Sequence, residues 1–263
     1  MIVMHTSENK KAYISELFSG IQGEGLWVGL RQIFLRFSGC DLRCQWCDTP
    51  NSLNIKQNSF AKIEKTAGKR DFEEFKNPLS FDFLLESIYS LEKDFKHHSI
   101  SLTGGEPLLQ ANFIKDFIID LKKNSSLLIY LETGGHRFEE LEQLINNLDI
   151  ISFDLKLPSS TGEKPLWEQH CKFIELIKKY NKKAYAKMVL TSQTTKHDLE
   201  QSFDLMKNSI ENCTLVLQPV TSSDLSLIPS PKQILNWQAM GINQLKSPNI
   251  RVIPQTHKFI GQI

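Results

Sequence analysis

Three cysteines in one short segment are the side chains of this sequence whose spacing most clearly suggests chemistry. Cys40, Cys44 and Cys47 stand in "SGCDLRCQWCDT" (38–49) with the spacing CxxxCxxC. A zinc site would need a fourth ligand, and no histidine stands at a matching spacing. A redox dithiol of the thioredoxin type uses CxxC alone and leaves Cys40 unexplained. A [4Fe–4S] cluster is normally held by four cysteine thiolates. If only these three cysteines bound such a cluster, all three would be explained and one iron would be left open.

A second candidate binding loop is "TGGEP" (103–107), which directly follows an apolar run. Its two glycines let the backbone approach a ligand closely, Glu106 offers an acceptor, and Pro107 ends the strand. Alone, this motif is equally suited to a tight turn. One strand after CxxxCxxC, it resembles the radical S-adenosylmethionine (SAM) superfamily. The resemblance implies a [4Fe–4S] cluster whose open iron chelates SAM and whose electron breaks the sulfonium bond to give a 5′-deoxyadenosyl radical.

The elements that would position these loops alternate along the chain. Apolar runs of strand length occur at 32–39, 98–105, 126–135, 149–158, 182–191, 213–220 and 249–258. Helical periodicity occurs at 80–95 (with Ser80 as candidate N-cap), 111–123, 137–148, 165–180, 196–208 and 230–241. The strands are apolar throughout rather than alternating, which favours a parallel sheet buried on both faces. We predict an α/β fold, a partial TIM-type βα barrel with about six parallel strands; a doubly wound sheet also fits.

Polar residues cluster where these strands end. They are Thr103 to Glu106, Glu132, Asp154 with Lys156, Gln218, and Gln255 with His257. In a βα barrel the C-terminal strand ends meet at one mouth, so we expect the chemistry there. Residues 50–79 do not share the pattern, because they are polar and weakly periodic. We predict that they form an insertion or a long loop with some helix, within a single domain of residues 1–263.

Composition excludes several classes of function. The 263 residues carry a net charge of +1, so no global field attracts nucleic acid or a membrane. "MIVM" at the N-terminus is too short for a signal peptide and the apolar runs are too short to span a membrane, which leaves the cytoplasm as the expected location. Five cysteines, an odd number, argue against a disulfide framework. We expect Cys171 on the buried face of its helix and Cys213 in the core, and no function for His136 or His170.

Longer segments narrow the resemblance. Residues 16–49, "ELFSGIQGEGLWVGLRQIFLRFSGCDLRCQWCDT", resemble the N-terminus of the 7-carboxy-7-deazaguanine synthase family. Four further motifs match that family in order: "TGGEPLLQ" (103–110), "YLETGG" (130–135), "VLQPV" (216–220) and "PQTHK" (254–258). The resemblance implies conversion of 6-carboxy-5,6,7,8-tetrahydropterin to 7-carboxy-7-deazaguanine with loss of ammonia, on the way to queuosine or archaeosine. It also implies that SAM is regenerated and that Mg²⁺ binds near the substrate carboxylate.

The resemblance assigns the pterin contacts to one group of side chains: Gln22, Glu24, Arg36, Thr103, Glu132 and His257. Gln22 and Glu24 lie in a glycine-flanked loop that can approach a flat ring, and the alternative is a polar surface turn. The guanidinium of Arg36 suits a carboxylate, and the alternative is a structural ion pair. Lys258 follows His257 and would point the opposite way in a regular strand, which leaves its role open.

The resemblance assigns the SAM contacts to a second group: Trp46, Gly104, Gly105, Glu106, Asp154, Lys156 and Gln218. Trp46 would shield the cluster, or be an ordinary loop hydrophobe. "SFDLKLP" departs from the serine-proline-lysine pattern of some members, which leaves the role of Asp154 as a ribose acceptor open. Thr49 is assigned to Mg²⁺, because this ion prefers oxygen and keeps several waters; a turn with Asp48 is the alternative.

Partners and competing functions complete the set of expectations. The family resemblance implies a homodimer and a flavodoxin- or ferredoxin-type electron donor. The runner-up enzyme is a glycyl-radical activase, which shares CxxxCxxC and would lack the "IQGEG" and "QTHK" elements. A non-catalytic zinc or iron–sulfur binding module is the alternative from another class.

Overall fold

One curved sheet of ten strands organises the chain, in the order β12-β11-β10-β9-β8-β7-β3-β2-β4-β5. The computed structural model describes residues 11–207 and 213–262. The parallel part of the sheet comprises β3 (Arg31–Phe37), β7 (Ser99–Gly104), β8 (Leu128–Thr133), β9 (Ile150–Asp154), β10 (Ala184–Leu190), β11 (Cys213–Pro219) and β12 (Ile250–Val252). This is the predicted partial βα barrel, with seven parallel strands where about six were expected.

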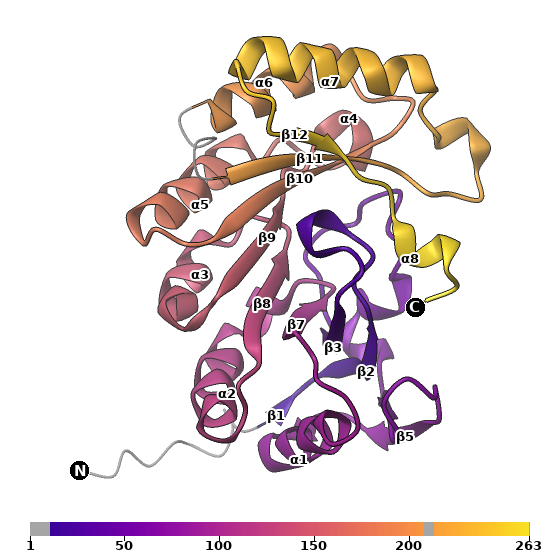
Figure 1. Cartoon of the computed structure of the whole chain (residues 1–263), viewed down its shortest axis with the longest axis vertical. Coiled ribbons are helices and arrows are strands. Elements are labelled where there is room, and N and C mark those ends of the chain that lie inside the picture. Colours follow the sequence, from indigo (N-terminus) through magenta and orange to yellow (C-terminus); the bar gives the residue numbers. More distant parts are fainter. Residues whose placement is uncertain (1–10, 208–212, 263) are drawn as a thin grey trace.

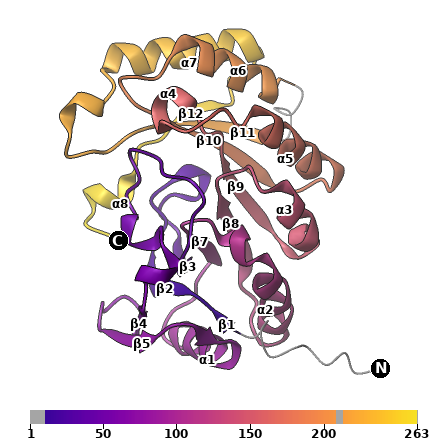
Figure 2. The ribbon, with the colours of Figure 1, turned by 180° about the vertical axis from the view of Figure 1, so that it is seen from behind.

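Helices cover the outer, convex face of this sheet (Figures 1 and 2). They are α1 (Phe81–Glu92), α2 (Ala111–Asn124), α3 (Phe138–Leu144), α5 (Trp167–Lys179), α6 (Lys196–Met206) and α7 (Pro231–Leu245). The short α4 (Pro158–Thr161) contacts the cysteine loop through Ser160, and the short α8 (Thr256–Phe259) contacts the N-terminal loop through Thr256. Ser80 caps α1 as predicted, because its side chain accepts a hydrogen bond from the backbone N–H of Phe83. None of the helices in the described part of the chain combines the length and apolar character needed to cross a membrane.

Single turns of 3-10 helix join several of these elements. They are η2 (Gly25–Trp27), η3 (Pro50–Ser52), η4 (Ile55–Gln57), η5 (Pro107–Gln110), η6 (Ile145–Asn147) and η7 (Leu225–Leu227). The predicted helix at 196–208 ends at Met206 in the structure, and residue 208 lies outside the described residues.

The strands alternate in character, contrary to the expectation of runs that are apolar throughout. On β8, Ile129 and Leu131 belong to the main core, whereas Glu132 points into the concave side. On β10, Ala186 and Met188 face the core and Lys187 faces the concave side. The polar inner residues are few and widely spaced in the sequence, so the apolar outer residues dominate the pattern.

Residues 50–79 contribute strands that the prediction omitted. After η3 and η4, β4 (Phe60–Glu64) and β5 (Phe72–Lys76) form an antiparallel pair that continues the sheet beyond β2 (Ile14–Ile21). β2, likewise not predicted, pairs antiparallel with β3. A two-residue pair, β1 (Lys11–Ala12) with β6 (Leu79–Ser80), forms a separate small sheet. Polar residues interrupt each of these segments, which removes the apolar signal on which strand prediction depends.

Two further expectations are wrong in detail. The strand predicted at 249–258 ends at Val252, and His257 and Lys258 lie on α8 instead. That helix is held against the N-terminal loop, because the backbone N–H of Thr256 donates to the carbonyl of Gly23 at 2.8 Å. Cys171 is exposed, because His170, Phe173, Ile174 and Ile177 form the buried face of α5.

Candidate active site

A cavity of about 740 Å³ opens at the C-terminal ends of the parallel strands. Every residue that the sequence analysis assigned to a cofactor, metal or substrate lines it: Gln22, Glu24, Arg36, Cys40, Cys44, Trp46, Cys47, Thr49, Thr103, Gly104, Gly105, Glu106, Glu132, Asp154, Lys156, Gln218 and His257. These residues come from segments spread over most of the chain. Their convergence follows from parallel strands, whose carboxyl ends meet at one rim of a barrel.

The cysteine loop presents three free, half-buried thiols to this cavity. A tight turn brings two of them together, because the N–H of Cys47 donates to the carbonyl of Cys44 at 3.0 Å. The N–H of Leu42 points at the Cys40 sulfur at 3.4 Å. Burial raises the pKa of the Cys40 thiol to about 11, so the loop favours a neutral thiol unless a positive centre is bound. The remaining cysteines, Cys171 and Cys213, do not line the cavity.

The "GGE" loop is packed against the cysteine loop. Gly104 has a φ of +136°, and a Cβ there would lie 2.2 Å from the carbonyl oxygen of Phe37. Two residues further on, the N–H of Glu106 donates to the carbonyl of Gly39 at 2.7 Å. Glycine is therefore required for the backbones of these two loops to touch. The close approach of this backbone to a ligand stays a prediction.

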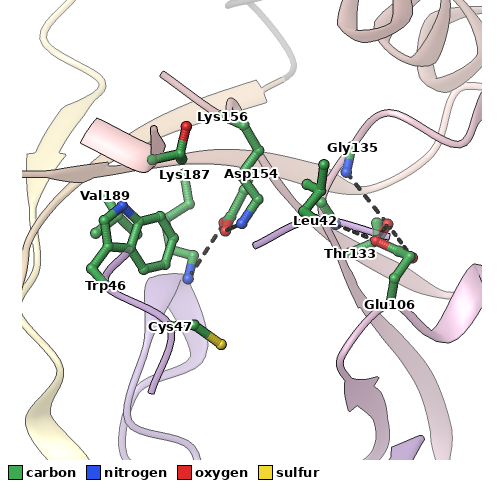
Figure 3. Close-up of polar contacts among 12 residues, drawn as sticks. Leu42, Trp46, Cys47, Glu106, Thr133, Gly135, Asp154, Lys156, Lys187 and Val189 are labelled. Atoms are coloured by element: carbon green, nitrogen blue, oxygen red, sulfur yellow. Dashed lines mark hydrogen bonds and ion pairs between the residues drawn. The ribbon is translucent and has the colours of Figure 1, made fainter. Parts of the chain in front are cut away.

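Glu106 is held by the loop after β8. Its carboxylate accepts bonds from the Thr133 hydroxyl at 2.8 Å and from the N–H of Gly134 at 2.8 Å, as Figure 3 shows for Thr133. Burial raises its pKa in spite of the neighbouring His136 and these donors. The three loops that carry Cys40, Glu106 and Thr133 thus form one hydrogen-bonded unit.

A second polar group lies deeper, around Glu132. Its Oε1 accepts from the Gln22 amide at 3.0 Å and from the Ser101 hydroxyl at 2.5 Å. Burial and the nearby charge of Glu24 raise the pKa of Glu132. The Gln22 amide, the Glu24 carboxylate and the Glu132 carboxyl, whose pKa is raised, together offer hydrogen-bond donors and acceptors to a flat heterocycle.

Glu24 is tied to the C-terminal segment. Gln255 donates from Nε2 to Glu24 Oε1 at 2.7 Å and to Asp48 Oδ2 at 2.8 Å, and Lys258 lies 3.2 Å from Asp48. A Cβ on Gly23 would lie 2.3 Å from the His257 ring, so this glycine lets α8 close over the loop. Glu24, Asp48 and His257 offer ligand atoms within 4.8 Å of one another. We assign no metal to them, because Lys187 and Lys258 already neutralise the two carboxylates.

Three predicted residues have neighbours that bear on their expected roles. Arg36 donates from Nε to Glu16 at 3.0 Å. This is the structural ion pair that the sequence analysis gave as the alternative to a substrate contact. Trp46 donates from Nε1 to Ser160 at 2.9 Å and stacks its ring 4.9 Å from the Lys156 ammonium. Gln218 is 1% exposed, and its Oε1 has no hydrogen-bond partner among the described residues. A buried unpaired acceptor facing a cavity is suited to a ligand N–H or O–H.

Sequence reasoning missed Lys187 and two histidines at this site. The signal for Lys187 was a charged residue inside the apolar run "AYAKMVL" (184–190). His170 donates from Nδ1 to the carbonyl of Gly135 at 2.7 Å and accepts from the N–H of Lys156 at 3.1 Å. His136 bonds Asp41, next to Cys40, at 3.0 Å. Both histidines therefore hold loops of the cavity in place.

Comparison with known proteins places this fold and site in a class. The family model described as the radical SAM superfamily matches residues 35–206. The crystal structure of QueE from Escherichia coli superposes with a TM-score of 0.56 at 21% identity, over 96% of this chain and 100% of that one. The chain belongs to the radical SAM superfamily.

Sequence relatives narrow the class. A 7-carboxy-7-deazaguanine synthase of Geobacter sulfurreducens is 36% identical over 254 residues, 96% of this chain and 98% of that protein. One of Archaeoglobus fulgidus is 33% identical over 255 residues, 95% of this chain and 99% of that protein. Within the superfamily, the chain belongs to the 7-carboxy-7-deazaguanine synthase family.

Proposed function

We propose that this protein converts 6-carboxy-5,6,7,8-tetrahydropterin to 7-carboxy-7-deazaguanine with loss of ammonia, in 7-deazapurine biosynthesis. One observation carries the proposal beyond family membership. Gln22, Glu24 and Glu132, whose polar groups match the edge of a pterin, share a cavity with the three cysteines. A ring held by those side chains would therefore lie in the same enclosed space as a group bound to the cysteines.

The residues present fit a [4Fe–4S] cluster and SAM. Three free thiols line the cavity, and neither Cys171 nor Cys213 does, so a cluster held there would keep one iron for another ligand. The unpaired Oε1 of Gln218 and the carboxylates of Glu106 and Asp154 would hold SAM. When bound, the cluster supplies the electron that cleaves SAM reductively.

The chain's own residues bind and orient the pterin. The Gln22 amide already bonds Glu132, so the two groups are set at one spacing before a ligand arrives. Because burial raises its pKa, Glu132 can hold a proton and act as a donor as well as an acceptor. Arg36 lies at the rim of the same cavity, where exchange of Glu16 for a substrate carboxylate would preserve its charge pairing.

The proposal also includes a Mg²⁺ ion bound by Thr49. This residue lines the cavity and directly precedes η3, to which its side chain makes no cap hydrogen bond. Its hydroxyl contacts the Cys47 sulfur at 3.8 Å. The hydroxyl oxygen would serve as one ligand, with the substrate and waters supplying the rest.

Turnover of the pterin tests the function. Protein reconstituted anaerobically with iron and sulfide would be incubated with the carboxytetrahydropterin, SAM, Mg²⁺ and a reductant. We expect 7-carboxy-7-deazaguanine and ammonia, with SAM recovered, and a drop in rate when Mg²⁺ is chelated. SAM cleavage without the deazaguanine would contradict the assignment and favour the activase. One tightly bound zinc and no iron would contradict the enzyme class. The homodimer, the flavodoxin- or ferredoxin-type donor and the cytoplasmic location stay predictions from the sequence.

A further inference from the structure

Lys187 lines the cavity and forms ion pairs with two of its carboxylates. Its side chain extends from β10 into the concave side and is 11% exposed. Its Nζ lies 2.5 Å from Glu24 Oε2 and 3.4 Å from Asp154 Oδ1. Among the described residues, no other cation forms ion pairs with both of these carboxylates. Lys187 therefore stands between the residue assigned to the pterin and the residue assigned to SAM.

The surroundings favour the charged forms of Lys187 and Asp154. Burial would lower the pKa of Lys187, but Asp154 and Glu24 raise it well above its usual value. Burial would raise the pKa of Asp154, but Lys156 and Lys187 more than reverse the effect. Lys156 lies 2.6 Å from the other oxygen of Asp154, and Figure 3 shows the two lysines on either side of this carboxylate. Lysine is rarely buried in a strand unless such partners hold it.

We propose that Lys187 is a positioning residue that couples the two ligand sites by sharing its ammonium between Glu24 and Asp154. The shorter of its two contacts is to Glu24, so this carboxylate keeps the ammonium away from Asp154. When Glu24 loses its charge, the ammonium moves towards Asp154 and competes with SAM for that acceptor. The pterin half of this coupling rests on the proposed function, whereas the SAM half rests only on the superfamily.

Cross-talk between the sites is the measurable consequence. Glu24→Gln removes a charge on the pterin side and leaves Asp154, Lys156 and Gln218 untouched. We expect the Kd for SAM to rise about fivefold, the lower end of typical coupling between two sites. In a Lys187→Met background the same Glu24→Gln change should leave the Kd for SAM unchanged, because the shared cation is gone.

The experiment is a double-mutant cycle on anaerobically reconstituted protein, with SAM binding followed by calorimetry and iron content measured for each variant. Lys179→Met, which removes an exposed lysine paired with Glu142 outside the cavity, is the matched control and should bind SAM as wild type does. An effect of Glu24→Gln that is equal in both backgrounds, or absent in the Lys187-containing protein, would overturn the coupling.

A second pair of variants guards against misfolding of Lys187→Met. Lys187→Arg keeps the charge and should restore the response of SAM binding to Glu24→Gln. In the reverse direction, Asp154→Asn should change the Kd for the carboxytetrahydropterin in protein that retains Lys187. If wild type binds SAM and never binds the pterin, the proposed function fails, and the SAM cycle still decides the role of Lys187.

Discussion

The two faces of the curved sheet are built on opposite principles. On the outer face, residues such as Leu102, Leu131 and Met188 are fully buried beneath helices and belong to the main hydrophobic core. On the inner face, their strand neighbours Ser101 and Lys187 are also buried and Glu132 is partly buried, yet these residues are polar and paired with one another or with loop residues. Both faces are therefore largely shielded from water, and the main difference is the chemistry of the side chains.

This contrast separates what holds the fold from what performs the reaction. An apolar contact contributes to stability in proportion to the area it removes from water, and it tolerates substitutions of similar volume. A buried polar network contributes little net stability, and each missing partner leaves an unsatisfied group. Substitutions on the outer face should consequently lower the free energy of unfolding, and those on the inner face should lower binding and turnover.

The largest effect is expected at the cysteine loop. Cys44→Ala removes one of three thiols that the cavity offers to a cluster, so cluster binding and turnover should be abolished. Cys44 lies in a turn outside the sheet, so the chain should remain folded, with circular dichroism matching that of wild type. Iron content and the brown absorbance give the measurement. Full turnover by this variant would refute the cluster assignment.

Leu131→Ala tests the outer face of β8. Leu131 is 0% exposed within the main core, and truncation should cost about 2–5 kcal/mol in free energy of unfolding. Urea denaturation of the iron-free protein measures it. The contrast between the faces would fail if the remaining folded fraction, once reconstituted, bound SAM far more weakly than wild type does.

His170 sharpens the contrast, because it is a polar group that reaches the cavity loops from an outer helix. Burial lowers its pKa to about 4, although the bond to the Gly135 carbonyl opposes the shift. Between about pH 6.5 and pH 4 the unfolded chain binds a proton that the folded chain refuses, so stability falls as pH falls through that window. The contribution is about 3 kcal/mol at neutral pH.

His170→Gln should remove this part of the pH dependence. The urea midpoints of wild type and variant would be measured between about pH 6.5 and pH 4, and they should converge as the pH approaches 4. Parallel curves at all pH values would show that the histidine does not titrate as the structure indicates.

Glu132→Gln is the inner-face counterpart of Leu131→Ala, one residue away on the same strand. The amide keeps the volume and loses the charge-assisted bonds to Gln22 and Ser101. Loss of one such bond to the pterin costs about 1.5–3 kcal/mol, or roughly a 10- to 100-fold rise in the Kd for pterin. Stability should change much less than in Leu131→Ala. A variant that bound pterin normally but unfolded easily would place Glu132 with the scaffold.

The sequence predicted the outer face better than the inner one. Apolar runs and helical periodicity located the seven parallel strands and the helices between them, because those signals arise from burial of contiguous residues. Family motifs located the residues that line the cavity. Lys187 was missed because it belongs to no motif and its partners, Glu24 and Asp154, are distant in sequence. β4 and β5 were missed because their residues are largely polar and exposed on one side.

The smallest effect is expected at Cys171, which lies just outside the buried face of α5 although Ile174 and Ile177 are buried as predicted. The sequence placed Cys171 on the buried stripe of α5, but the structure exposes it and buries His170 beside it. Cys171→Ser should therefore shift the free energy of unfolding by less than about 0.5 kcal/mol. Ile174→Ser, three residues along the same helix and 5% exposed, is the matched substitution and should cost several times more. Urea denaturation of both variants decides the point, because equal losses would put Cys171 back in the core. The buried face of α5 then includes His170, whose imidazole bonds Gly135 and Lys156 in the loops of the cavity.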